Sequence, residues 1–80
     1  MPRIVVSEEE LLQILNARLQ AHDECTDCRF TSVVRLQEQQ SDGCNWSTAN
    51  LRCSGTPASA CMPIARAVIT EVAETHNLST

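Results

Sequence analysis

The 80-residue chain is poor in aromatic residues, with one Phe, one Trp and no Tyr, so its core must be built from aliphatic side chains. It has two glycines, which are too few for the usual glycine-rich phosphate-binding loop. The motifs G-x-x-x-x-G-K-S/T and H-E-x-x-H are both absent from the sequence. We therefore identify no catalytic residues and no pattern that requires an enzyme.

Positive charge is also scarce. Ten acidic side chains accompany six arginines and no lysine, and the net charge is −4. This balance makes nucleic acid an unlikely partner and argues against a polybasic membrane-surface protein, because both depend on basic residues. No apolar run approaches the ~18 residues that span a bilayer, and residues 1–6 are too short for the core of a signal peptide. We expect a cytoplasmic protein without a membrane partner.

The chain contains no internal repeat and no linker, so we expect residues 1–80 to form one domain. A helix is predicted from Glu8 to His22. Ser7 can cap its first turn, and Glu10, three residues later, completes a capping box. The apolar side chains of this segment fall on one face of the helix: Leu11, Leu12, Ile14, Leu15 and Leu19.

A β-hairpin is predicted in the middle of the chain. The segment from Arg29 to Gln37 alternates with a period of two, and the dipeptide Asp42-Gly43 is typical of a two-residue type I′ turn. A second strand, from Trp46 to Cys53, should return beside the first. This turn predicts inner-face pairs of Leu36 with Ala49, Val34 with Leu51, and Ser32 with Cys53, and an outer face with Arg29, Thr31, Val33 and Arg35.

A second helix completes the predicted fold. It begins near Ala60 to Met62, after a turn over residues 56–59, and ends at about Asn77, with Pro63 tolerated near its start. Ile4 to Val6 can add a short strand parallel to the first hairpin strand. The predicted fold is α+β, a two-layer sandwich in the order (β)-α-β-β-α, in which the antiparallel hairpin packs against two antiparallel helices.

This topology brings four of the five cysteines together. Cys25 and Cys28 follow the first helix, Cys53 ends the returning strand, and Cys61 opens the second helix, whereas Cys44 lies at the opposite end. The spacing is C-x2-C-x24-C-x7-C. Four converging thiolates suit a structural zinc ion, with His22 on the adjacent helix end as an alternative ligand.

The cysteines have other interpretations. They can be buried thiols that act as small apolar side chains, they can form one or two disulfides, or the C-x-x-C loop can carry redox chemistry. The loop follows a helix C-terminus, where the helix dipole disfavours a thiolate. Its acidic neighbours Asp23, Glu24 and Asp27 disfavour a thiolate further.

The outer face of the hairpin is the predicted partner surface. Arginine offers bidentate donors and tryptophan a stacking surface, so a face with both can bind an anion, a peptide or a single strand. An ordinary solvated face, or a homodimer through this face or an open strand edge, are the alternatives. The residues assigned to this face are Arg29, Arg35, Arg52, Trp46 and Asn50.

These features lead to a ranked set of functions. We predict a small non-catalytic binding or protein-interaction module, stabilised by a cysteine zinc site if zinc is present, whose partner is a protein or a small anionic ligand. The alternative is a thiol-redox or metal-handling protein that uses the C-x-x-C loop. Weak nucleic-acid or anion binding through the arginine face ranks third.

Overall fold

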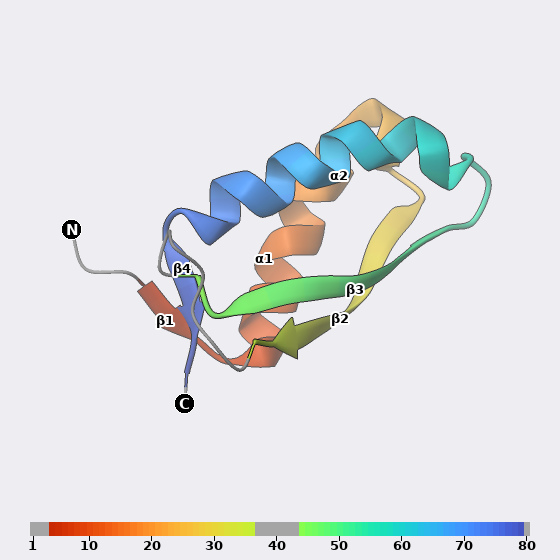
Figure 1. Ribbon diagram of the computed structural model, residues 1–80. Helices are drawn as coiled ribbons and strands as arrows, with labels where there is room; N and C mark the ends of the chain where they lie inside the picture. Colours follow the sequence, from red (N-terminus) through yellow and green to blue (C-terminus); the bar gives the residue numbers. More distant parts are fainter. Residues whose placement is uncertain (1–3, 37–43, 80) are drawn as a thin grey trace.

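Figure 1 shows the computed structural model of the chain, which describes residues 4–36 and 44–79. The α+β fold and the predicted order of the central elements are confirmed, and one further strand follows the second helix. The elements are β1 (Ile4–Val6), α1 (Glu8–Gln20), a 3-10 turn η1 (Asp23–Cys25), β2 (Cys28–Arg35), β3 (Trp46–Cys53), α2 (Ala58–Ala73) and β4 (His76–Leu78).

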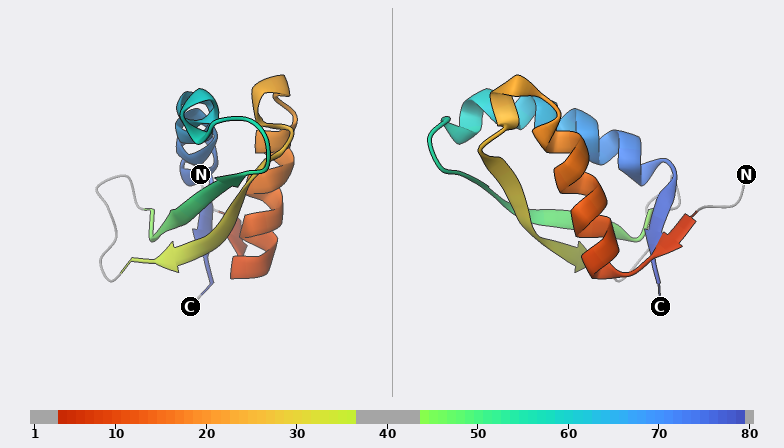
Figure 2. Two further views of the ribbon diagram at one scale, coloured as in Figure 1. Left: turned by 90° about the vertical axis from the view of Figure 1, so that its right-hand side faces the viewer. Right: turned by 180° about the vertical axis from the view of Figure 1, so that it is seen from behind.

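The two helices pack on the antiparallel hairpin of β2 and β3, with α1 against β2 and α2 against β3 (Figure 2). The domain is elongated, 36 Å along its long axis and 20 Å across. Among the described residues, neither helix is long and apolar enough to cross a membrane. The apolar side chains between helices and hairpin form the core, which is led by Leu11, Leu15, Leu19, Phe30 and Trp46.

Helix α1 begins as its sequence predicts and ends slightly early. The hydroxyl oxygen of Ser7 accepts a hydrogen bond from the Glu10 N–H (3.1 Å), which satisfies a free donor of the first turn. The helix ends at Gln20, two residues before the predicted end at His22. Helix α2 begins at Ala58, ahead of the predicted start, so Pro63 is its sixth residue. The turn predicted over residues 56–59 is therefore partly the first turn of α2.

The predicted register of the hairpin is wrong by four residues. Ser32 pairs with Ala49 instead of Cys53, and the Leu36 N–H donates to the Asn45 carbonyl (2.9 Å). The connection is therefore longer than a two-residue turn, and Gln37 and the dipeptide Asp42-Gly43 lie outside the described residues. A shift by an even number leaves every side chain on the same face, so the alternating pattern could not distinguish the two registers.

Both strands change which face they turn inward near Asn50. This residue has a positive φ of 56°, a left-handed conformation that Asn tolerates better than most residues. After Asn50, Leu51 packs against the core, and before it Trp46 is buried. These two residues are five positions apart, so a regular strand would place them on opposite faces. On β2 the predicted roles of two valines are exchanged as a result: Val33 packs against the core and Val34 is 46% exposed.

The remaining strands form a separate two-stranded sheet. β1 forms as predicted, but it pairs in parallel with β4 rather than with β2, and the segment His76–Leu78 is a strand where the sequence predicts the end of a helix. Side chains join β4 to the hairpin. The indole N–H of Trp46 donates to the His76 carbonyl (2.8 Å), and the Asn45 amide both donates to the Leu78 carbonyl (3.1 Å) and accepts from the Leu78 N–H (2.9 Å). These bonds occupy the backbone groups of β4, so it does not extend the hairpin sheet.

Candidate functional site at the cysteine end

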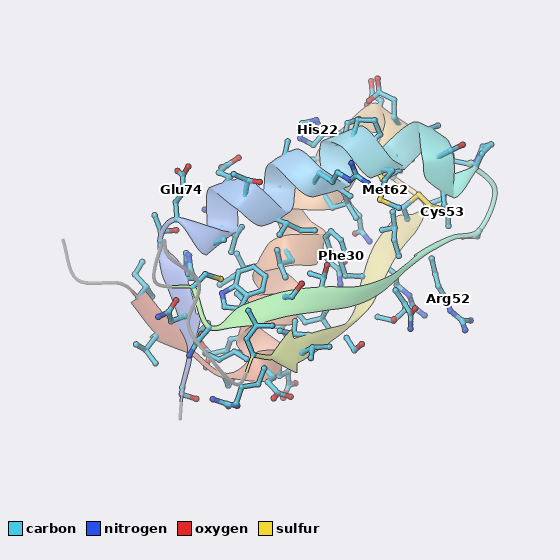
Figure 3. The ribbon with its side chains drawn as sticks, in the orientation of Figure 1. His22, Phe30, Arg52, Cys53, Met62 and Glu74 are labelled. Atoms are coloured by element: carbon cyan, nitrogen blue, oxygen red, sulfur yellow. A yellow bond between two sulfur atoms is a disulfide. The ribbon has the colours of Figure 1, made fainter. Side chains whose placement is uncertain are left out.

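The predicted convergence of four cysteines is confirmed. Cys25 ends η1, Cys28 begins β2, Cys53 ends β3 and Cys61 lies in the first turn of α2. They form two disulfides, Cys25–Cys61 and Cys28–Cys53, seen beneath α2 in Figure 3. The fifth cysteine, Cys44, belongs to neither disulfide and is buried with its sulfur 3.3 Å from the carbonyl oxygen of Trp46.

The disulfides join each cysteine of the C-x-x-C loop to a distant part of the chain. Cys25 and Cys28 are bonded to Cys61 and Cys53, 36 and 25 residues away, and not to each other. Cys28 and Cys53 are direct partners in the β ladder, with their Cα atoms 4.0 Å apart. The loop is therefore a junction where two links fasten η1 to α2 and β2 to β3.

The sulfurs of the two disulfides lie close together. Those of Cys28, Cys53 and Cys61 lie within 4.8 Å of one another, and Cys25 is bonded to Cys61. Cys25, Cys28 and Cys61 are fully buried, whereas Cys53 is half-buried. Three of the four predicted ligands are thus grouped and Cys25 is bonded to one of them, but all four sulfurs are in disulfides, whereas zinc binds thiolates. The alternative ligand, His22, is exposed and lies outside the sulfur group of the described chain.

Asp27 fastens the C-x-x-C loop to the segment that follows β3. Its carboxylate accepts a hydrogen bond from the Thr56 N–H (2.7 Å), and its carbonyl accepts from the Ser54 N–H (3.1 Å) and hydroxyl (3.2 Å). The hydrogen bonds from Thr56 lower the pKa of Asp27 below its usual 3.8. A Cβ at Gly55 would lie 2.9 Å from the carboxylate, so a larger residue there would displace the Asp27 side chain. In the sequence, Asp27 is recognisable only as an acidic neighbour of the cysteines, and no local pattern indicates its bonds to Ser54 and Thr56.

An open pocket of about 470 Å³ lies beside the Cys28–Cys53 disulfide. The side chain of Gln20 supports one wall by donating to the Cys28 carbonyl (3.1 Å). Figure 3 shows Arg52 directed away from the helices, next to Cys53. The residues that line the pocket are Gln20, Thr26, Asp27, Cys28, Arg29, Arg52, Cys53 and Ser54.

Two arginines stand opposite each other at this pocket. Arg29 and Arg52 are cross-strand partners in the ladder, and both side chains are exposed. Like charges placed directly opposite on a sheet repel each other. Within residues 4–36 and 44–79, the ion pair is Arg18 with Glu71, and no acidic side chain forms an ion pair with either arginine of the pocket. The pocket therefore combines two unpaired guanidinium groups with the single carboxylate of Asp27.

The other residues assigned to the partner face do not join this pocket. Arg35 is exposed, but it lies at the far end of β2, opposite Trp46, and donates to the Ser79 carbonyl (2.6 Å). The expected outward direction of Trp46 is wrong: its side chain is 2% exposed, because the change of face at Asn50 turns it inward. Asn50 is exposed and is the residue at which the inward-facing side of the strand changes. The predicted surface is thus divided along the hairpin.

Comparisons with models of protein families, with curated proteins and with solved structures find no significant match for this chain. The function has to be inferred from the chemistry of the site itself. That chemistry is concentrated at one pocket, which is lined by the Cys28–Cys53 disulfide and by two cross-strand arginines. The chain is a small cysteine-rich α+β domain with its candidate site at the cysteine end.

Proposed function

We propose that this domain is a small non-catalytic binding module whose pocket at the cysteine end binds the anionic group of a ligand. The observation that carries the proposal is the placement of Arg29 directly opposite Arg52 at the pocket. An exposed pair of like charges weakens the hairpin it stands on. An anion between the two guanidinium groups would remove this repulsion and accept bidentate hydrogen bonds from them.

The charge of the pocket supports an anionic ligand of modest size. Two arginines and Asp27 give the lining residues a net charge of +1 in a chain of net charge −4. One carboxylate oxygen of Asp27 already accepts the Thr56 N–H, so this carboxylate is partly compensated by the protein. A carboxylate or a phosphate has the right charge and the planar or forked oxygens that arginine recognises. We propose one of these two groups as the ligand.

The pocket is better suited to binding than to acid–base catalysis. A general base works best when its pKa lies near the working pH. The carboxylate among the lining residues is Asp27, and its pKa is lowered from 3.8 by hydrogen bonds from Thr56, which makes it a weaker base. In this proposal the two disulfides hold the pocket's walls in place, and the anion is bound without being changed.

A titration tests the proposal. The oxidised protein is titrated separately with inorganic phosphate and with a small dicarboxylate, and amide chemical shifts are followed by NMR. We expect saturable shifts near Arg29 and Arg52 with one of the anions, and at least tenfold weaker binding in Arg29→Gln and Arg52→Gln. Arg66→Gln removes an exposed arginine of α2 and serves as the matched control. Equal weakening by Arg66→Gln, or no saturable shift with either anion, would refute the proposal.

A second candidate function, thiol–disulfide exchange, is favoured by the half-buried Cys53 in the same pocket. The thiolate of an anionic thiol, attracted by Arg52, would attack the sulfur of Cys53. A mixed disulfide forms, the Cys28–Cys53 bond breaks, and its electron pair stays on Cys28, which then takes a proton. Mass spectrometry of the protein incubated with a carboxylate-bearing thiol checks this. We expect an adduct on Cys53 that forms more slowly in Arg52→Gln. If no adduct forms at neutral pH, exchange is excluded.

The state of the cysteines also bears on the compartment of the protein. Disulfides persist in oxidising compartments and are rare in the cytosol. The cytoplasmic location expected from the sequence predicts reduced cysteines, whereas the two disulfides favour an oxidising compartment. Trapping free thiols in intact cells, followed by a count of the labelled cysteines, decides between them. One labelled cysteine corresponds to the two-disulfide form, and five correspond to a fully reduced cytoplasmic form.

A further inference from the structure

We propose that reduction of the two disulfides converts the four-sulfur cluster into a tetrathiolate zinc site, so that the domain has a disulfide form and a zinc form. This inference goes beyond the proposed anion binding, which concerns the oxidised protein. From the sequence alone, zinc and disulfides are alternative states of these cysteines. The structure points to the same sulfurs in both, because those of Cys28, Cys53 and Cys61 lie within 4.8 Å of one another across both disulfides, and the fourth, that of Cys25, is bonded to Cys61.

The distances suit such an exchange. Zinc holds thiolate sulfurs at about 2.3 Å in a tetrahedron, which places them roughly 3.8 Å from one another. The sulfurs of Cys28, Cys53 and Cys61 already lie within 4.8 Å of one another, across both disulfides. Opening the two S–S bonds lets each bonded pair move apart, and the ion then draws the two pairs together. For these three sulfurs shifts of about 1–2 Å are sufficient, which side-chain rotation can supply, and the Cys25 side chain has to turn toward them once its bond to Cys61 opens.

The backbone that carries the sulfurs is held by bonds that reduction does not break. Asp27 accepts hydrogen bonds from Ser54 and Thr56, which ties the C-x-x-C loop to the segment between β3 and α2. Gln20 donates to the Cys28 carbonyl, which ties the start of β2 to α1. Cys28 also remains opposite Cys53 in the ladder of the hairpin. The four positions should therefore stay near one another when the sulfurs are free.

Some of the charges around the four sulfurs favour a negatively charged zinc–thiolate complex, and others disfavour it. A zinc ion with four thiolates carries a charge of −2. Arg29 follows Cys28 and Arg52 precedes Cys53 in the sequence, so two positive charges lie near the complex. Cys61 lies in the first turn of α2, where the helix dipole favours a thiolate. The acidic side chains of the loop oppose the site: Asp23, Glu24 and Asp27. Asp27 places a carboxylate oxygen 3.6 Å from the Cys28 sulfur, and in the complex the two arginines and the helix dipole offset this negative charge.

The chemistry balances with a dithiol as the reductant. Each disulfide takes two electrons and two protons from one dithiol, which closes into its own disulfide, and four thiols result. Zinc then displaces four protons and binds four thiolates. A two-electron oxidant for each disulfide reverses the process and releases the ion. The domain would thereby couple metal release to oxidation, with the disulfides replacing the ion as the link between its elements.

Cobalt spectroscopy tests the inference, because Co²⁺ reports the number and type of its ligands. The full chain is reduced and freed of oxygen, then titrated with Co²⁺ and next with Zn²⁺. We expect one equivalent to bind with the intense visible absorption of tetrahedral tetrathiolate cobalt, and zinc to abolish it. The oxidised chain should bind none, and reduced Cys44→Ser should bind as the wild type does.

A ligand exchange keeps the test decisive if a cysteine variant folds poorly. Cys25→His retains a metal ligand, so it should still bind Co²⁺ with a spectrum shifted to three thiolates and one imidazole, whereas Cys25→Ala should bind at least tenfold more weakly. Absence of cobalt binding by the reduced wild type, or an unchanged spectrum in Cys25→His, would overturn the proposal. The anion titration uses oxidised, metal-free protein, so failure of one proposal is distinguishable from failure of the other.

Discussion

The two ends of the hairpin are fixed by different kinds of interaction. At the cysteine end, two disulfides join η1, α2 and both strands, and the neighbouring first residues of α2 are exposed. At the opposite end, Trp46 is buried and its indole donates to β4, while the Asn45 amide makes two further bonds to that strand. One end is thus held covalently, and the other by apolar burial and hydrogen bonds.

The difference shows how a small domain with few aromatic residues is stabilised. A chain of this size buries a limited apolar surface, and disulfides or a metal commonly compensate for it. Trp46, the largest of the fully buried side chains, lies at the end away from the cysteines. Because covalent links hold the cysteine end together, its surface does not have to be covered, and it contains the pocket with Arg29 and Arg52. The stability of this end therefore depends on redox conditions, and that of the other end does not.

Removing a disulfide should have the largest effect of all. Each closes a loop of 25 or 36 residues, and the chain-entropy estimate gives about 3.5–4 kcal/mol for each. We expect Cys28→Ser with Cys53→Ser to lower the free energy of unfolding by about that amount, measured by urea denaturation. A reducing agent should then destabilise this variant less than the wild type, because one disulfide remains to be broken. An equal loss in both proteins would show that the Cys28–Cys53 link adds nothing.

Trp46→Phe should act next in size and should be independent of redox conditions. It removes the indole donor from the His76 carbonyl and reduces a fully buried side chain, which together should cost about 2 kcal/mol. Urea denaturation of oxidised and reduced protein measures the cost in each state. The comparison of the two ends predicts the same cost in both. A cost seen in one redox state alone would mean that the ends are coupled.

The same contrast explains what the sequence could reveal. The start of α1 follows from contacts between near neighbours, with Ser7 capping Glu10 and leucines spaced along one face. The grouping of four cysteines follows from the order and length of the elements, because each element crosses the domain once. Both depend on local pattern and simple topology, so both were predictable.

The register, the burial of Trp46 and the partner of β1 depend on contacts between distant residues. A shift of four preserves the alternation, so the pairing of Cys28 with Cys53 was hidden in the pattern. The left-handed Asn50 reverses the inward face in mid-strand, and Asn is compatible with ordinary strand geometry as well. The strand β4 is held by side chains of Asn45 and Trp46, which no periodicity encodes. The state of the sulfurs likewise depends on redox conditions rather than on spacing.

A smaller effect with a defined pH dependence is expected at Asp27. Hydrogen bonds from Thr56 lower its pKa in the folded protein below the ordinary 3.8, so the carboxylate stabilises the fold above that pH. This contribution should disappear as the pH falls from 3.8 through the lower folded value. The difference in unfolding free energy between wild type and Asp27→Asn should therefore be largest near neutral pH and shrink below about pH 4. Asp23→Asn, at a nearby exposed position, is the control, and a difference that grows in acid would contradict the assignment.

The smallest expected effect belongs to the two arginines of the pocket, and its sign matters more than its size. Arg29→Gln and Arg52→Gln replace exposed side chains, so each should change stability by less than about 0.5 kcal/mol. A double-mutant cycle at low salt should show a repulsive coupling of about 0.2–0.5 kcal/mol between them, because the like charges are direct cross-strand partners.

Adding the anion identified by titration should make the wild type more stable than the Arg29→Gln, Arg52→Gln double variant. A ligand that binds the folded state alone stabilises it in proportion to the logarithm of its concentration, so the wild type should gain and the double variant should not. Thermal unfolding with and without the anion measures this gain, with high salt of a non-binding ion as the control for screening. An attractive coupling in the absence of ligand would mean that the pair is already compensated within the protein, and the electrostatic reason for an anion in this pocket would be lost.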